Sequence, residues 1–265
     1  MQPDMSTTSI GAALATPSSA RRDIMILLLS VAGGSVDAVI ILGFNVLTAA
    51  QTGNTILLAV SLAQGRFSTG FYAAVSAFAY MVGAAVGELV VGKRRGSASW
   101  LSPVGRGLVA ELIALGSLLG SWRLAGPSPA LGTTAVPVAI AAIAMGVQSA
   151  VVLRLHVGPT TTYVTGTLTS LATKIVRGLY IIKKAPAATT YAQDANSAIL
   201  WSSKGPVIYG VDWLVYAGGA CVSALLFLRV REVALVLPMA AIVAAIIGIK
   251  KVECSKLARS SRCST

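Results

Sequence analysis

The sequence has too little charge to coat a globule in water. Only 11% of its 265 residues are charged and 55% are hydrophobic, whereas soluble domains typically carry about 25% charged residues. Instead, the chain contains six hydrophobic runs, which cover residues 24–47, 71–92, 108–119, 135–153, 207–228 and 233–249. Several of them approach the roughly 20 residues that cross a bilayer as a helix, so the composition predicts an all-α polytopic membrane protein.

Residues that carry out chemistry in enzymes are also scarce. The chain has one His, three Cys and nine acidic residues, and the Cys spacing matches neither a metal site nor a disulfide framework. The sequence has no Walker loop, no Gly-x-Ser-x-Gly and no His-Glu-x-x-His motif. We therefore expect no catalytic residues, no metal and no cofactor, which argues against an enzyme and against an ATP-driven pump.

Basic residues are the exception to this shortage of charge. Lys and Arg number 21 against nine acidic residues, which gives a net charge of +12. They lie between the hydrophobic runs and in the tail 251–265 rather than along one face, which argues against a nucleic-acid partner. We expect the tail to contact anionic lipid headgroups, and we expect the Ser/Thr/Ala-rich segment 1–22 to be disordered.

A pattern of glycine and polar residues occurs twice among the hydrophobic runs. Its two copies are Gly34-Ser35-Val36-Asp37, Gln51-Thr52-Gly53-Asn54-Thr55 and Gly65, and then Gly146-Val147-Gln148-Ser149, Val164-Thr165-Gly166-Thr167 and Gly178. Because the offset between the copies is 112 or 113 residues throughout, we interpret the pattern as an internal duplication, which is typical of secondary transporters. Membrane repeat 1 then covers 23–126, and membrane repeat 2 covers 127–250 with an insertion at 183–206.

Two short segments, 48–63 and 161–175, decide how many times the chain crosses the membrane. Both are short and polar for spans, so they predict re-entrant or broken helices. With six spans and a cytoplasmic N-terminus, 17 of the 21 basic residues lie inside, whereas 14 would lie inside if both segments crossed. The positive-inside rule therefore favours six spans with both termini and the insertion in the cytoplasm. Three spans per repeat make the two copies inverted repeats.

Asp37 is the most unusual residue of the first hydrophobic run. It lies about 20 Å from the start of the run at Ile24, at a rise of 1.5 Å per residue. An ionisable group at that depth costs at least about 2.5 kcal/mol, so it needs a polar cavity or a partner. Two interpretations stay open: a proton or cation site, or a structural hydrogen bond to a broken helix. The second copy has Ser149 instead, so a charge-coupled step would use repeat 1 alone.

Each Thr-Gly motif predicts a break in a helix. Gly permits the break, and the neighbouring Thr and Asn side chains can cap the helix that follows. The N-terminus of a half-helix also attracts anionic or hydrogen-bond-accepting groups, so a solute site between the motifs is one interpretation and local capping is the other. The predicted site residues are Asp37, Thr52, Gly53, Asn54, Thr55, Gln148, Tyr163, Thr165, Gly166 and Thr167.

The other acidic residues of the hydrophobic runs have simpler interpretations. Glu88 and Glu111 lie near the predicted cytoplasmic ends of their spans, close in sequence to basic residues. We expect ion pairing or snorkelling at the helix ends for both. Asp212 lies a few residues into its span, and we expect it to be solvated at the membrane interface.

The motifs resemble those of the YoaK family of bacterial integral membrane proteins, which is classed as a domain of unknown function. The resemblance rests on residues 34–38, 51–65 and 161–169 and extends over about 24–249, whereas the insertion around 185–204 departs from the compact family pattern. It implies a six-span protein of the bacterial cytoplasmic (inner) membrane without an established activity, often regarded as a transporter.

Together these features favour a small-solute permease or secondary transporter, with its site between the two Thr-Gly motifs. The alternative is a non-transporting membrane scaffold or accessory subunit, which predicts a dry interface filled by side chains between the motifs. The expected partners are the lipid bilayer and a small solute, and the sequence leaves open whether the protein forms a homo-oligomer.

Overall fold

The computed structural model describes residues 19–92, 101–124, 131–155, 164–184 and 205–262. The regular structure in these ranges is entirely helical, which confirms the all-α prediction. The helices are α1 (Ser19–Phe44), α2 (Gln51–Ala63), α3 (Phe67–Gly92), α4 (Leu101–Leu124), α5 (Leu131–Arg154), α6 (Val164–Lys184), α8 (Gly205–Arg229), the 3-10 helix η1 (Arg231–Leu235) and α9 (Val236–Arg262). Most of the N-terminal segment predicted to be disordered (1–18), and the centre of the predicted insertion (185–204), lie outside the described residues.

Six of these helices are long and apolar enough to cross a membrane, namely α1, α3, α4, α5, α8 and α9. The number agrees with the prediction. The candidate span in α4, Pro103–Trp122, is longer than the hydrophobic run 108–119, because a Pro in the first turn of a helix removes no intrahelical hydrogen bond and lets the helix begin earlier. The two remaining helices correspond to the segments predicted to be short: α2 has 13 residues, while α6 continues as far as Lys184.

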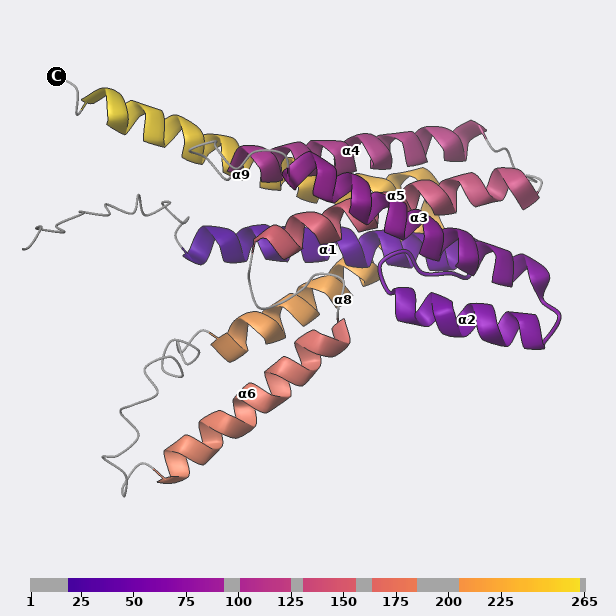
Figure 1. The fold of residues 1–265 in the computed structure, drawn as a ribbon, viewed down its shortest axis with the longest axis horizontal. Helices are drawn as coiled ribbons and strands as arrows, with labels where there is room; N and C mark the ends of the chain where they lie inside the picture. Colours follow the sequence, from indigo (N-terminus) through magenta and orange to yellow (C-terminus); the bar gives the residue numbers. More distant parts are fainter. Residues whose placement is uncertain (1–18, 93–100, 125–130, 156–163, 185–204, 263–265) are drawn as a thin grey trace, which may run out of the picture.

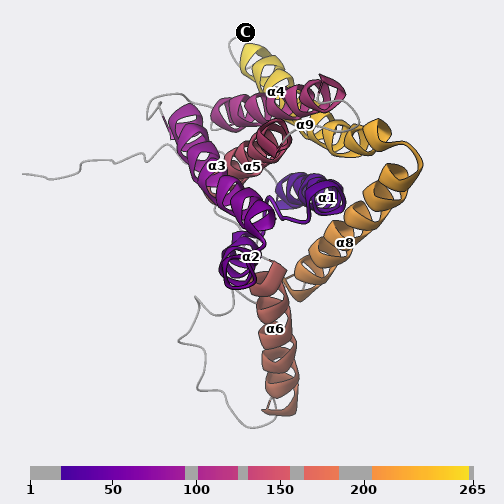
Figure 2. The ribbon, with the colours of Figure 1, turned by 90° about the vertical axis from the view of Figure 1, so that its right-hand side faces the viewer.

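The helices α1 and α5 form the centre of the bundle (Figure 2). In the membrane-spanning windows of α1 and α5, 67% and 72% of the residues respectively are buried. The corresponding share in the other four spans is 22–39%. Helix α1 packs against α8 and α9, and α5 packs against α3 and α4. The outer spans expose large apolar side chains such as Phe78, Ile113 and Leu228. An exposed apolar surface of this extent is expected where a protein contacts lipid.

Glycines of the duplicated pattern bring the central helices into backbone contact with their neighbours. A Cβ atom at Gly34 would lie 2.2 Å from the carbonyl oxygen of Tyr216 on α8. A Cβ atom at Gly146 would lie 2.2 Å from the carbonyl oxygen of Tyr80 on α3. No larger residue fits at either position, and small residues commonly allow such close approach between membrane helices.

Successive spans run in opposite directions along the bundle (Figure 1). Helices α1, α4 and α8 run one way and α3, α5 and α9 run the other way, so the start of α1 and the end of α9 lie at the same end. The two remaining helices do not alternate in this way, since α2 runs in the direction of α1, and α6 runs in the direction of α5. Helix α2 packs beside α3, and α6 packs beside α8.

Candidate functional site

The chain reverses between α1 and α2, at the first Thr-Gly motif. Helix α1 ends before Asn45, whose φ of 57° lies in the left-handed region, a conformation that Asn tolerates better than most residues at the end of a helix. The chain then turns back through residues 45–50, and α2 begins at Gln51 in the same direction as α1 (Figure 1). The backbone of this reversal forms no helix, so its N–H and C=O groups need other partners.

Asp37 is the partner of two backbone N–H groups of the reversal. Its Oδ1 atom accepts hydrogen bonds from the Thr48 backbone N–H at 2.7 Å, the Thr48 hydroxyl at 2.9 Å and the Ala49 backbone N–H at 2.8 Å. The Tyr216 hydroxyl of α8 donates to Oδ2 at 2.7 Å. Because the side chain is only 4% exposed, these four donors replace the solvent that a carboxylate requires. This geometry matches the interpretation of Asp37 as a structural partner of a broken helix.

Asn54 holds the reversal from the side of α2. Its side chain accepts a hydrogen bond from the Leu47 N–H at 2.9 Å and donates to the Leu47 carbonyl at 2.6 Å. The Ser76 hydroxyl of α3 donates to the same carbonyl at 2.6 Å. Residues of three helices, α1, α2 and α3, therefore fix the peptide groups between Leu47 and Ala49.

The remaining residues of the first motif contribute less. A Cβ atom at Gly53 would lie 2.7 Å from the Leu47 side chain, so glycine allows the reversal to pack closely on α2. Thr52 is exposed, and so is Thr55, whose hydroxyl donates to the Gln51 carbonyl one helical turn earlier at 3.0 Å. Neither threonine is directed into the reversal.

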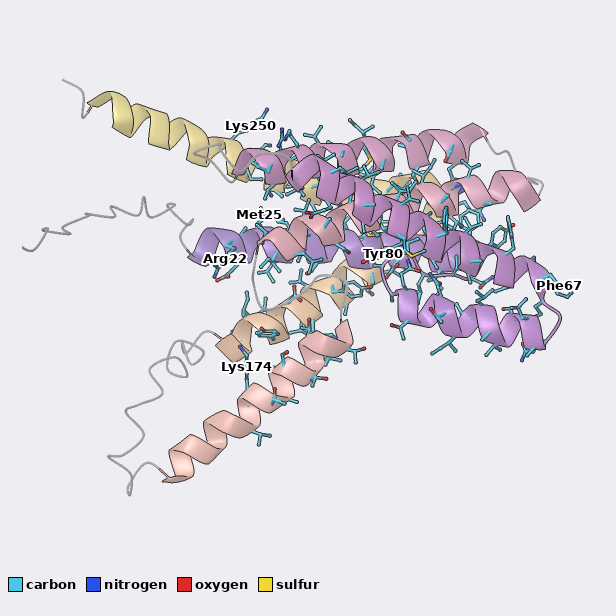
Figure 3. The ribbon with its side chains drawn as sticks, in the orientation of Figure 1. Arg22, Met25, Phe67, Tyr80, Lys174 and Lys250 are labelled. Atoms are coloured by element: carbon cyan, nitrogen blue, oxygen red, sulfur yellow. The ribbon has the colours of Figure 1, made fainter. Side chains whose placement is uncertain are left out.

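The second motif begins α6. Thr167, in the first turn, is 3% exposed, and its hydroxyl has no hydrogen-bond partner among the residues that the structure describes. Thr165 and Gly166 are exposed, while Tyr163 lies outside the described residues. Further along α6, Lys174 projects toward α8 (Figure 3), where its Nζ atom lies 4.4 Å from the centre of the Tyr209 ring.

Gln148, the last predicted site residue, lies away from both motifs. It is buried in α5, and its Nε2 atom donates to the Leu29 carbonyl of α1 at 2.8 Å. The structure thus brings Asp37, Gly53 and Asn54 together around one reversal and uses Gln148 to join the two central helices.

Several important residues were not predicted from the sequence. Besides Tyr216 and Ser76, these include Tyr80, whose hydroxyl donates to Ser149 at 2.7 Å. A sequence signal for the tyrosines does exist. Tyr80 and Tyr216 are 136 residues apart, and the predicted insertion 183–206 accounts for 24 of these, which leaves the offset of 112 found between the copies.

Two predictions about acidic residues were wrong. Asp212 is 3% exposed and accepts a hydrogen bond from Ser30 of α1, so it is not solvated at an interface. Glu111 is fully buried, and its carboxyl oxygens have no hydrogen-bond partner within the described ranges, so it does not form the expected pair at a helix end. Both predictions failed because the burial of these residues depends on how α4 and α8 pack against neighbouring helices, which hydrophobicity along the chain does not predict.

Comparison with known proteins identifies the family. Residues 25–248 match the family described as "Protein of unknown function (DUF1275)". The chain belongs to this family. A related DUF1275-like protein is "UPF0700 transmembrane protein YoaK" of Bacillus subtilis (strain 168), which is 28% identical over 170 residues, or 63% of this chain and 72% of that protein. The resemblance to the YoaK family is therefore confirmed, and no solved structure matches the chain.

Proposed function

We propose that this DUF1275 protein is a small-solute permease or secondary transporter built from two inverted repeats. The observation that carries the proposal is a two-fold correspondence among its helix contacts. If α1 is exchanged with α5, α2 with α6, α3 with α8 and α4 with α9, the main contacts map onto one another. The corresponding helices also run in opposite directions (Figure 1). Inverted repeats of membrane helices are a common plan of secondary transporters.

Individual residues follow the same correspondence. Gly34 meets the Tyr216 carbonyl and Gly146 meets the Tyr80 carbonyl in the same geometry. The Tyr216 hydroxyl donates to Asp37, while the Tyr80 hydroxyl donates to Ser149, the residue at the equivalent position. These matched contacts support the duplication more directly than the sequence pattern does, because they join parts of the chain that are far apart.

The contacts divide the helices into two groups that do not coincide with the repeats. The α1 group consists of α1, α6, α8 and α9, and the α5 group consists of α2, α3, α4 and α5. The first helix of each repeat therefore packs in the group formed by the other repeat. The groups meet through α1 with α5 and through α4 with α9. Alternating access in transporters commonly arises when one such group rocks against the other.

The proposed solute site lies between the starts of α2 and α6, which are close together in both views of the ribbon (Figures 1 and 2). Two helix N-termini at one place favour an anionic or hydrogen-bond-accepting solute. The buried hydroxyl of Thr167, which has no hydrogen-bond partner in the described part of the chain, supports this position. We do not assign a coupling proton to Asp37, because all of its accepting capacity is directed at the reversal and Tyr216.

Solute binding is tested by replacing the Thr167 hydroxyl. Purified full-length protein is screened for thermal stabilisation by inorganic phosphate, sulfate, acetate and neutral sugars, and any stabilising anion is then used for uptake into liposomes. Thr167→Val removes the hydroxyl at nearly constant shape and should weaken anion binding at least about tenfold, because a hydrogen bond to a charged group contributes about 1.5–3 kcal/mol. Thr173→Val is the matched control, because Thr173 is exposed and bonds only within α6.

The alternative, a non-transporting scaffold or accessory subunit, is also supported by one observation. The buried side chains of Asp37, Asn54 and Ser76 around the first reversal are bonded to that reversal or to one another. A scaffold predicts that no compound in the screen stabilises the protein, and that a partner protein copurifies with it. Stabilisation and uptake that are equally unaffected by Thr167→Val and Thr173→Val would argue against the proposed site.

A further inference from the structure

Glu111 is a buried carboxyl group that the proposed function does not use. It belongs to a stripe of α4 residues that are at most 2% exposed and are otherwise apolar: Val104, Leu108, Glu111, Leu115 and Leu118. Both oxygens of Glu111 lack a hydrogen-bond partner among the described residues. Glu111 follows Pro103, the first residue of the span, by eight positions, so it lies about 12 Å into the membrane region at 1.5 Å per residue.

Among the side chains that the structure describes, none neutralises this carboxyl. Helix α4 packs against α5, α9, α3 and η1. The charged or titratable residues with described side chains on those elements and on α4 itself are Tyr72, Tyr80, Glu88, Arg231, Lys250 and Arg106. The three basic ones are exposed, and none of the six hydrogen-bonds to Glu111. A carboxylate without a partner is very unfavourable in such surroundings, whereas a neutral carboxylic acid is tolerated.

Two other buried acids of the described chain are different. Asp37 has four hydrogen-bond donors, and Asp212 has the Ser30 hydroxyl. Both oxygens of Asp37 therefore have hydrogen-bond partners. Glu111 alone among these three has no hydrogen-bond donor within the described residues.

We propose that Glu111 is a proton-binding site, and that it carries the coupling proton of transport. Its carboxylate takes up one proton to form the neutral acid and later releases the same proton on the other side of the membrane. Helix α4 suits this task because it packs in the α5 group and also contacts α9 of the α1 group, so a movement between the groups changes the surroundings of Glu111. The coupling role rests on the proposed function, whereas the proton site itself does not.

The proton site is tested with dicyclohexylcarbodiimide, an apolar reagent that enters membranes and modifies protonated carboxyl groups. The acid adds across one C=N bond, its proton passes to nitrogen, and the adduct rearranges to a stable N-acylurea that peptide mass spectrometry locates. In full-length protein in liposomes, Glu111 should be modified and Asp37 should not. Above the midpoint of its titration, labelling of Glu111 should fall about tenfold per pH unit, as the protonated fraction does.

A second measurement does not depend on access of the reagent. The infrared spectrum of the folded protein should contain the carbonyl band of a buried, protonated carboxylic acid, and Glu111→Gln should remove that band and the label together. Glu111→Leu serves as a second variant, which should fold at least as well as the wild type because it removes an unpaired polar group. A band and label that are both missing from the wild type, or both retained in Glu111→Gln, would overturn the site.

The coupling role has a separate readout. For the first anion that stabilises the protein, uptake into liposomes is measured with and without an imposed pH gradient. Glu111→Gln should abolish the acceleration by the gradient while exchange of the anion across the membrane continues. Acceleration that persists in Glu111→Gln overturns the coupling role. If the wild type transports none of the anions, the proposed function fails, and the label and infrared band still decide whether Glu111 binds a proton.

Discussion

At the scale of single residues, the buried carboxyl groups show how the same chemistry is used in different ways. Asp37 accepts two backbone and two hydroxyl hydrogen bonds, Asp212 accepts one from Ser30, and Glu111 accepts none within the described chain. Satisfied polar groups make a buried structure specific, whereas each unsatisfied one in a native protein calls for an explanation. The number of donors therefore separates the structural acid, Asp37, from the functional candidate, Glu111.

The structural role of Asp37 predicts a large loss of stability when it is removed. Asp37→Ala leaves the Thr48 and Ala49 N–H groups without their partner, and it should lower the free energy of unfolding by roughly 2–5 kcal/mol. The matched control is Ser149→Ala at the equivalent position of the other repeat, which loses the Tyr80 hydroxyl bond and should cost about 1 kcal/mol. Reversible unfolding in mixed detergent micelles measures both. Equal losses for the two variants would contradict the capping role.

The part of the site that could be predicted from the sequence is the part that depends on local chain properties. Gly53 and Asn54 were predicted at a helix break, because glycine and a short amide side chain break and cap helices wherever they occur. Tyr216 was not predicted, because its bond to Asp37 spans 179 residues of sequence and depends on how α8 packs against α1. Glu111 was misjudged for a similar reason, since its burial depends on where neighbouring helices pack rather than on hydrophobicity along α4.

At the scale of helices, α2 and α6 are the elements that distinguish this fold from a plain six-helix bundle. Each follows a central helix, runs in the same direction as that helix, and packs beside a span of its group (Figure 1). The lengths of the hydrophobic runs predicted that both helices are unlike ordinary spans, because these two runs are short and polar. It did not predict the full length of α6, which extends through a basic C-terminal half to Lys184.

If the repeats are inverted, the ends of α2 and α6 face opposite sides of the membrane. We test this by replacing Cys221, Cys254 and Cys263 with Ser and introducing either Ala63→Cys or Val176→Cys, at exposed positions of the two helices. Gly65 is avoided because its φ of 68° would strain a side chain. A membrane-impermeant maleimide should label Ala63→Cys on intact cells, and Val176→Cys only after the cells are opened. Labelling of both from the same side would contradict inverted repeats.

At the scale of the whole molecule, the two proposed repeats are interlocked. The first helix of each repeat is the most buried part of its half, and its main neighbours come from the other half: α1 packs against α8 and α9, and α5 packs against α3 and α4. Gly34 and Gly146 make this packing specific. The backbone of α1 at Gly34 contacts the backbone of α8, and the backbone of α5 at Gly146 contacts the backbone of α3. Neither repeat can therefore bury its central helix on its own.

This interlocking predicts that the two halves of the chain fold only together. A chain divided between residues 126 and 127 gives a first half whose α1 lacks α8 and α9, and a second half whose α5 lacks α3 and α4. Each half expressed alone should be degraded or should lack protease-resistant structure, because the packing that stabilises membrane helices is missing. Co-expressed halves should copurify and regain the protease resistance of the intact chain.

Two variants of the first half serve as controls. Gly34→Leu should prevent recovery, since a side chain there collides with the Tyr216 backbone. Gly116→Leu should permit recovery, because a side chain there meets open space. A half that folds stably alone would show that its central helix finds partners within its own repeat, and it would contradict the exchange of first helices on which the two-group arrangement depends.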